Sequence, residues 1–460
     1  MSSTSRGRRS TISTIGAVAA TGLLLAACSP AGSGGGDSTT SSGGGDSSSD
    51  GGSSEQTTVT FRLWDEAAAK AYETSFAEFE KEHADINVEI EVVPWANYWE
   101  QLPLDISSGE MADIFWTNTS NFGRYADNGD LLDITATLGD DHDEWSQAVV
   151  DLYTRDGKLW GVPQLQDGIA LFYNKTIVDA AGIDPTTLKW DPTGASDTLL
   201  PALQAVTKDA NGNAPTDAAF DINNVAVWGL NAQADLQAIW GPFVGSNGGV
   251  YQDGDELALD SPENVETFTY LVDLINTHKV APPAADTAAN GDLSREYFVQ
   301  GKLAFFQSGQ YSLPATADIG DTFEWGIVPA LEGPAGRVTL VNGIVAAGNA
   351  KTENLEATTT VLQWLGSDAG QVALAESGAA FPAAVGAQQS YVDFWTEQGV
   401  DVTALQEATQ AESIPAPVGP NIQAGFGEIG PFFEEMFQGR LPVAEALAQA
   451  QAAGNTAING

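Results

Sequence analysis

The stretch TTVTFRLWDE, residues 57–66, sets the pattern from which the fold can be predicted. Apolar and polar residues alternate over 59–63, which indicates a β-strand. Aromatic residues then recur at helical spacing over 72–79 among alanine, glutamate and lysine, which indicates an amphipathic helix. A second alternating run follows at 86–92. The chain therefore opens with the order strand, helix, strand.

The same order continues beyond this unit. A helix is expected from near Asn97, disturbed by Pro103, and the apolar run 114–116 is expected to form a third strand. Strands and helices in alternation are typical of an α/β domain with a mainly parallel sheet.

The second half of the chain has similar signals. We expect strands at 169–173 and 303–306, and a helix capped by Ser261. Ser294 is expected to cap a short helix, and Pro442 to begin an alanine-rich one. The body from residue 57 onward holds about 400 residues, and two lobes are expected because a single hydrophobic core rarely grows that large.

The N-terminus carries a targeting signal. Three arginines precede an apolar run at 15–27, which is too short to span a membrane and is followed by Cys28. The ending Leu-Ala-Ala-Cys resembles a bacterial lipobox, which implies a signal peptide over 1–27 and lipidation of Cys28. A plain cleaved leader or an ordinary membrane anchor is the alternative, and the export route stays open between general secretion and twin-arginine export. Residues 28–56 are rich in Gly and Ser and are expected to form a flexible tether that reaches roughly 30 Å.

Composition excludes several classes of function. The chain has 62 acidic and 18 basic residues and a net charge of −44, a field that repels nucleic acid. Cys28 is the single cysteine, so no disulfide can form within the chain. With three histidines and no nucleophile or zinc motif, nothing indicates catalysis or a metal site. Asp253-Gly254-Asp255 resembles a fragment of a calcium loop, but a hairpin turn explains it better.

Polar and aromatic residues directly follow two predicted strands. These are Trp64 with Asp65, and Trp116 with Asn118. In α/β sheets ligands bind beyond the carboxyl ends of strands, so these residues are candidates for a site. Burial of both tryptophans in the core is the alternative.

Several blocks of the body, taken in order, resemble one family. The blocks are 59–64, 76–81, 109–116, 125–132, 156–163, 170–175, 298–304, 325–329, 357–370 and 378–382. They are similar to extracellular solute-binding proteins of carbohydrate-uptake ABC transporters, the family that includes maltose-binding proteins.

The resemblance implies a two-lobed α/β fold of the type II periplasmic-binding-protein kind. The ligand would lie in the cleft between the lobes, and two or three crossing segments would form the hinge. The crossings are expected near 165–167, 341–343 and 381–382. Lobe 1 would comprise 57–165 and 342–381, and lobe 2 would comprise 166–341 and 382–460.

The family's binding regions, carried over to this chain, give the remaining site candidates. Sugars present apolar faces and hydroxyl rims, so rings and polar side chains are the expected contacts. The full set is Trp64, Asp65, Trp116, Asn118, Asn121, Asp167, Trp240, Asn247, Gln310, Tyr311, Asn342, Gly343 and Phe426. Trp95, Tyr98 and Trp99 form a tight cluster that helical packing explains as well.

Three positions depart from the family's usual pattern. Gly168 stands where the family often has threonine after the acid, and Tyr311 and Phe426 stand where it often has tryptophan. Smaller rings change the stacking, so a maltose-like specificity does not follow.

We therefore expect a monomeric sugar-binding component of an ABC importer. It would be lipid-anchored at the outer face of a bacterial membrane and would use neither cofactor nor metal. Its partners would be a carbohydrate and permease subunits. A lipid-anchored glycoside hydrolase, a binding protein for another solute, and a chemosensory protein remain the alternatives. The sequence does not specify the sugar, its linkage or the permease.

Overall fold

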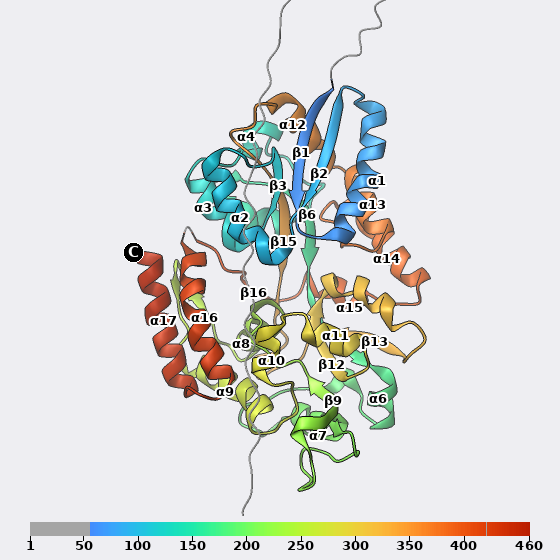
Figure 1. Cartoon of the computed structure of the whole chain (residues 1–460), viewed down its shortest axis with the longest axis vertical. Helices are drawn as coiled ribbons and strands as arrows, with labels where there is room; N and C mark the ends of the chain where they lie inside the picture. Colours follow the sequence, from blue (N-terminus) through green and yellow to red (C-terminus); the bar gives the residue numbers. More distant parts are fainter. Residues whose placement is uncertain (1–55, 420) are drawn as a thin grey trace, which may run out of the picture. The chain divides into compact units, whose positions relative to one another are not determined.

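The computed structural model describes residues 56–419 and 421–460 (Figure 1). The expected signal peptide, the lipidation site Cys28 and the tether up to residue 55 lie outside the described residues. Within the described ranges, no helix has both the length and the apolar character needed to cross a membrane.

The first lobe is built on a five-stranded sheet in the order β2-β1-β3-β15-β6. Its strands are β1 (Thr57–Leu63), β2 (Ile86–Val92), β3 (Ile114–Thr117), β6 (Val162–Asp167) and β15 (Asn342–Gly348). β1 pairs in parallel with β2 and β3, as predicted, whereas β15 runs antiparallel to both of its neighbours. The sheet is therefore mixed, because one strand comes from the distant segment that begins at Asn342.

The helices of this lobe follow from local sequence. They are α1 (Glu66–Glu82), α2 (Trp95–Ser108), α3 (Thr119–Asp127), α4 (Ile134–Leu138), α5 (Gln147–Tyr153), α12 (Leu355–Leu365) and α13 (Asp368–Glu376), with the small pair β4 (Thr154–Arg155) and β5 (Lys158–Leu159). Asp65 caps α1 by accepting a hydrogen bond from the backbone N of Ala68 at 2.7 Å. α2 begins two residues before the expected Asn97 and continues through Pro103.

The second lobe has its own five-stranded sheet in the order β13-β7-β12-β9-β8. These strands are β7 (Ile169–Asn174), β8 (Lys208–Asp209), β9 (Val225–Leu230), β12 (Leu303–Gly309) and β13 (Trp325–Pro329). Its helices are α6 (Lys175–Ala180), η1 (Pro185–Thr187), α7 (Leu199–Val206), η2 (Ile222–Asn224), η3 (Leu236–Trp240), α8 (Gly241–Ser246), α9 (Pro262–Asn276), α10 (Ala284–Ala289), α11 (Leu293–Val299), η4 (Gln310–Ser312), η5 (Pro314–Ile319), α16 (Ile422–Phe437) and α17 (Val443–Asn459). The last two helices pack against each other, and α17 also packs against α9 (Figure 1).

Most of the local signals in this lobe are confirmed. Ser261 caps α9, and α17 begins directly after Pro442. The Asp253 segment forms the hairpin of β10 (Gln252–Asp253) and β11 (Glu256–Leu257). The prediction for Ser294 is wrong, since Asp292 holds the cap position of α11. Ser294 lies inside that helix and donates from Oγ to Gln233 Oε1 at 2.5 Å.

Three chain segments lie side by side where the chain passes between the two sheets. In the pairing of β6 with β15, Asp167 lies opposite Asn342. A third segment joins them through a bridge between Leu165 and Pro382 and a hydrogen bond from the Gln166 N to the Phe381 O at 3.1 Å. We call these segments, 165–168, 341–344 and 381–382, the crossing ribbon.

Elements near the ribbon connect the two cores. They are β14 (Thr339–Leu340), η6 (Val385–Ala387), α14 (Gln388–Glu397), α15 (Thr403–Ala408) and β16 (Ser413–Ile414). Each sheet has its own large apolar cluster. A third cluster joins Phe172 of β7 to Phe381 and Tyr391, whose rings lie 5.3 Å apart. The two lobes thus share a packed base beside the ribbon.

Gly168→Ala is expected to destabilise the protein. A Cβ atom at Gly168 would lie 2.8 Å from the Cβ of Ala408 and 2.9 Å from the backbone of Leu405 and Thr409, so α15 would have to shift. Overpacking of this kind costs about 1–3 kcal/mol. The matched control is Gly427→Ala inside α16, where no atom lies within 4 Å of the added Cβ. There the higher helix propensity of alanine should stabilise by up to about 1 kcal/mol. Urea unfolding measures both, and equal midpoints for the two variants would contradict this packing.

Candidate ligand-binding cleft

A cavity of about 450 Å³ lies between the ends of strands from both sheets. Seven of the residues predicted from the sequence line it together: Trp64, Asp65, Trp116, Asn118, Asp167, Tyr311 and Asn342. Trp64 and Asp65 follow β1, Trp116 lies near the end of β3 and Asn118 follows it. Asp167 and Asn342 face each other across the ribbon, and Tyr311 follows β12. The expectation that ligands bind beyond the carboxyl ends of strands therefore selects residues that lie around one cavity.

Trp64 is the centre of an aromatic cluster on the first lobe. Its ring centroid lies 5.2 Å from that of Trp95, 5.0 Å from that of Tyr98 and 5.0 Å from that of Trp116. Trp95 also lines the cavity and is 53% exposed, whereas Trp116 is 1% exposed. The cluster therefore presents one exposed ring, that of Trp95, which packs through Trp64 against buried rings.

Trp116 supports this wall from within the core. Its Nε1 is buried beside the hydroxyl of Tyr72, and a hydrogen bond from Trp116 opposes the rise in the Tyr72 pKa that burial causes. The indole N–H therefore belongs to the core behind the cavity rather than to the surface that a ligand meets.

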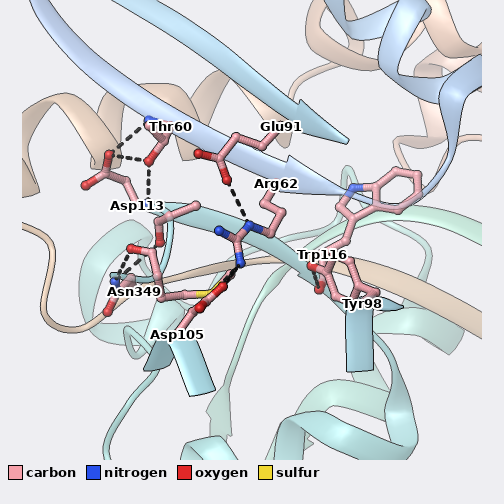
Figure 2. A network of polar contacts seen from close by, with 10 residues as sticks. Thr60, Arg62, Glu91, Tyr98, Asp105, Asp113, Trp116 and Asn349 are labelled. Atoms are coloured by element: carbon pink, nitrogen blue, oxygen red, sulfur yellow. Dashed lines mark hydrogen bonds and ion pairs between the residues drawn. The ribbon is translucent and has the colours of Figure 1, made fainter. Parts of the chain in front are cut away.

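A polar network holds the strand ends of the first lobe in place (Figure 2). Arg62 of β1 donates to Glu91 at 2.8 Å and to Asp105 of α2 at 2.5 Å. Tyr98 of α2 donates to the carbonyl O of Trp116 at 2.7 Å. These bonds attach α2, which carries Trp95, to the strands that carry Trp64 and Trp116.

The other end of the same sheet has its own polar contacts (Figure 2). Asp113 accepts from both the backbone N and the Oγ1 of Thr60, each at 2.9 Å. Asn349 donates to the carbonyl O of Met111 at 3.1 Å. β1, β3 and the end of β15 are therefore joined by side chains as well as by strand pairing.

Asp167 is the most perturbed acid of the cleft. It is 8% exposed, and burial together with the negative charge of Asp65 raises its pKa to about 7. No basic group offsets the effect of burial and of Asp65 on the pKa of Asp167. Asp167 therefore exchanges a proton easily near neutral pH.

The second-lobe wall contains residues that the sequence analysis missed. Asp235 caps η3 by accepting from the Ala238 N at 2.8 Å, and burial raises its pKa. The Nε2 of Gln237 is buried without a hydrogen-bond partner among the described residues. Arg295 and Asp292 also line the cavity and form an ion pair at 2.7 Å. Asp235 and Gln237 follow β9. If that strand is recognised in the sequence, the expectation that ligands bind beyond strand ends makes both residues candidates.

The structure places six of the predicted residues outside the lining of this cavity. Trp240 is 3% exposed in the second-lobe core, and the ring of Phe426 stacks on it at 6.4 Å. Asn247 ends α8 and donates to the Glu263 O at 2.9 Å. Asn121 donates to the side chain of Asn118 at 2.8 Å.

Of the last two of the six, Gly343 belongs to the ribbon and Gln310 bonds to it from η4. Gln310 is 1% exposed, and its Oε1 accepts from the Gly168 N at 2.5 Å. The carbonyl O of Gly343 accepts from the Tyr153 hydroxyl at 2.5 Å. These contacts hold the ribbon and its surroundings together, so the two residues shape the cleft without lining it.

A larger hollow of about 850 Å³ lies on the opposite face of the ribbon. Alternate residues of a strand point to opposite faces. Leu165 and Asp167 line the smaller cavity, whereas Gln166 between them lines the larger one. The aromatic cluster and the ends of β1, β3 and β12 contribute to the lining of the smaller cavity and not to that of the larger one, so we take the smaller cavity as the candidate site.

The lining indicates what the cleft can bind. It combines an exposed aromatic ring, carboxylates and amide side chains, a set that suits a solute with apolar faces and many hydroxyl groups. Within the described ranges, no group of three or more His, Cys, Asp or Glu side chains is placed to hold a metal ion.

Comparisons with known proteins agree with this geometry. The family described as bacterial extracellular solute-binding protein matches residues 63–372, and the chain belongs to it. The chain is 25% identical to the arabinooligosaccharide-binding protein of Bacillus subtilis, over 53% of this chain and 52% of that protein. It is also 25% identical to the maltodextrin-binding protein MdxE of the same organism, over 54% of each. The matches thus span about half the length of these curated relatives.

Solved structures extend the likeness to the whole fold. Mycobacterium tuberculosis UspC is 46% identical, with a TM-score of 0.71 over 87% of this chain and 100% of that one. Lmo0181 of Listeria monocytogenes, an ABC substrate-binding protein in complex with cycloalternan, is 23% identical, with a TM-score of 0.75 over 88% and 99%. The expected two-lobed α/β fold is confirmed, and the proteins matched are binding proteins rather than enzymes.

Asp167→Asn is expected to change how stability depends on pH. The folded protein holds the Asp167 proton up to about pH 7, whereas an unfolded aspartate loses it near about pH 3.9. The free energy of unfolding of the native protein should therefore fall as pH rises through this window. Relative to it, the variant should gain up to about 4 kcal/mol between about pH 4 and pH 8. Urea unfolding across this range measures the difference, and parallel pH profiles would show that Asp167 titrates normally.

Proposed function

We propose that this protein is the substrate-binding component of an ABC importer that captures an extracellular sugar. The observation that carries the proposal is the cleft, where the exposed Trp95 ring shares one cavity with carboxylates and amide side chains from both lobes. A sugar matches this set because its C–H faces stack on rings and its hydroxyls both donate and accept hydrogen bonds.

Capture and delivery follow from a ligand that touches both lobes. Trp95 belongs to the first lobe, and Gln237 belongs to the second lobe. A solute that binds both side chains stabilises the conformation in which they are close together. A permease that docks preferentially on that conformation then receives loaded protein.

The N-terminal segment gives this component its place in the cell. Lipidation of Cys28 at the outer face of the membrane, followed by a tether to residue 56, would keep the folded body near its permease. A tether with a reach of roughly 30 Å raises the local concentration and makes docking effectively intramolecular.

A glycoside hydrolase is the alternative that one observation favours. Hydrolases use an acid with a raised pKa beside a second carboxylate, and Asp167 next to Asp65 resembles such a pair. One Asp65 oxygen is already engaged, however, as the cap of α1. The family and the matched structures are binding proteins, so we infer that the pair binds without catalysing.

Trp95→Ala should weaken carbohydrate binding by about tenfold, the equivalent of about 1.4 kcal/mol of lost stacking. The matched control is Leu104→Ala, on the same helix, whose side chain is 65% exposed and lies away from the cavity. Thermal shift against a panel of mono- and oligosaccharides should identify one stabilising class, and calorimetry then measures the two variants. Stabilisation by an amino acid or a polyamine, with no response to any carbohydrate, would contradict the sugar assignment.

Prolonged incubation with α- and β-glycosides should release no new reducing ends. The Asp65–Asp167 pair lies in a site that we infer evolved for retention of the solute. A reducing-end assay with the full-length protein measures this, with Asp167→Asn as the control for contaminating hydrolases. Turnover that disappears in the variant would establish the hydrolase instead.

A further inference from the structure

We propose that Arg62 is a positioning residue for solute binding. It does not line the cleft, but it holds α2 so that the ring of Trp95 lies where a solute can stack on it. This inference rests on the proposed function. The helix α2 has little support from its own sequence, and side-chain contacts with neighbouring strands replace that support (Figure 2).

The sequence of α2 leaves the helix weak at two points. It begins at Trp95 after Pro94, and no side chain caps its first turn. An uncapped first turn keeps backbone N–H groups without partners and frays easily. Pro103, inside the helix, has no N–H to donate to the preceding turn. The position of Trp95, the first residue of the helix, therefore depends on contacts with the rest of the lobe.

Two side-chain contacts hold α2, one on each side of the internal proline. The Tyr98 hydroxyl donates to the carbonyl O of Trp116 at 2.7 Å, close to the start of the helix. Near the other end, Asp105 accepts from Nη1 of Arg62 at 2.5 Å. Asp105 lies about 15 Å along the helix axis from Trp95. A single attachment would let the helix pivot, and the second one, through Arg62, removes that freedom.

The surroundings of Arg62 indicate a role in placement. Its side chain is 11% exposed, and its Nε donates to Glu91 of β2 at 2.8 Å while Nη1 donates to Asp105 of α2. Removal of charged groups from water costs about as much as their attraction returns, so such a group adds little net stability. The rigid guanidinium plane does fix the directions of its two acceptors. Arg62 therefore sets where β2 and α2 lie relative to β1.

Loss of Arg62 would displace α2 from the sheet. Glu91 and Asp105 form no other ion pair within the part of the chain that the structure describes. Both carboxylates point toward the guanidinium, so without it two negative charges would face each other (Figure 2). Their repulsion would move α2, and the ring of Trp95 would move with it.

The tryptophans beside the cleft give a readout that needs no ligand. The ring centroids of Trp64 and Trp99 each lie 5.2 Å from that of Trp95, with interplanar angles of 76° and 83°. Indoles held at fixed angles give near-UV circular dichroism, which is lost when their packing becomes variable. Trp95→Ala identifies the part of the spectrum that depends on this ring. Arg62→Gln should remove most of that part, whereas a change that only lowered stability would leave it intact in the folded protein.

A double-mutant cycle then measures the effect on binding. Calorimetry on the full-length protein uses maltotriose and raffinose as carbohydrate probes. Arg62→Gln should weaken binding about fivefold, less than Trp95→Ala, because the ring is misplaced rather than removed. In the Trp95→Ala background the same substitution should change the affinity by about twofold or less. Equal losses in the two backgrounds would show that Arg62 does not act through Trp95 and would overturn the inference.

Arg155→Gln is the matched control. Arg155 pairs with Asp127 at 2.9 Å in the same lobe, and neither side chain lines the cavity. This variant should keep both the native spectrum and the native affinity. If Arg62→Gln fails to fold, Asp105→Asn removes the charge that holds α2 while Arg62 keeps Glu91, and it should show the same spectral loss.

The remaining outcomes separate this inference from the proposed function. A near-UV spectrum that stays native in both Arg62→Gln and Asp105→Asn would refute the positioning role and leave sugar binding intact. A native protein that binds no carbohydrate at all would instead refute the proposed function, and with it the role of Arg62 in binding.

Discussion

The structure depends on one strand pairing, in which residues 165–167 of β6 lie against 342–344 of β15. This pairing completes the first sheet with a strand from a distant part of the sequence. Immediately beyond Asp167 the chain enters the second sheet. The Leu165–Pro382 bridge adds the third segment. Because both sheets are attached to the same short ribbon, the cleft has a fixed base from which its two walls extend.

The residues that line the two walls of the cleft lie at strand ends. Side chains packed behind those residues hold them in position. Trp64 follows β1 and Trp116 lies near the end of the neighbouring β3, and α2 is held to those strands by Arg62 and Tyr98 (Figure 2). An exposed ring such as Trp95 would lose side-chain and backbone entropy on binding if its helix were loose. The ion pair and hydrogen bonds already fix the helix in the folded protein. Less conformational entropy is therefore lost when the aromatic surface binds a ligand.

The succession of strands and helices along the start of the first lobe, and its strand-end residues, could be predicted because they depend on local alternation and on the general geometry of parallel sheets. Trp240 and Phe426 could not be assigned correctly in the same way. A family position shows where a stacking ring can lie, but helix packing decides whether it faces the cleft, and here the two rings pack on each other. Asp235 and Gln237 were missed because the short apolar run Val225–Leu230 fits a strand or a buried helix segment by pattern alone, and its pairing with β12 shows that it is a strand.

The ribbon also explains why an acid such as Asp167 can persist where it is costly. Strand alternation aims Leu165 and Asp167 into the cleft and Gln166 toward the hollow behind it. A carboxyl group on this strand cannot turn away from the cleft without breaking the pairing with Asn342. The resulting unfavourable burial is relieved when a bound solute supplies donors or positive charge. Because the relief occurs only in the presence of the ligand, the stability lost in the empty site contributes to the difference in free energy that favours the loaded conformation.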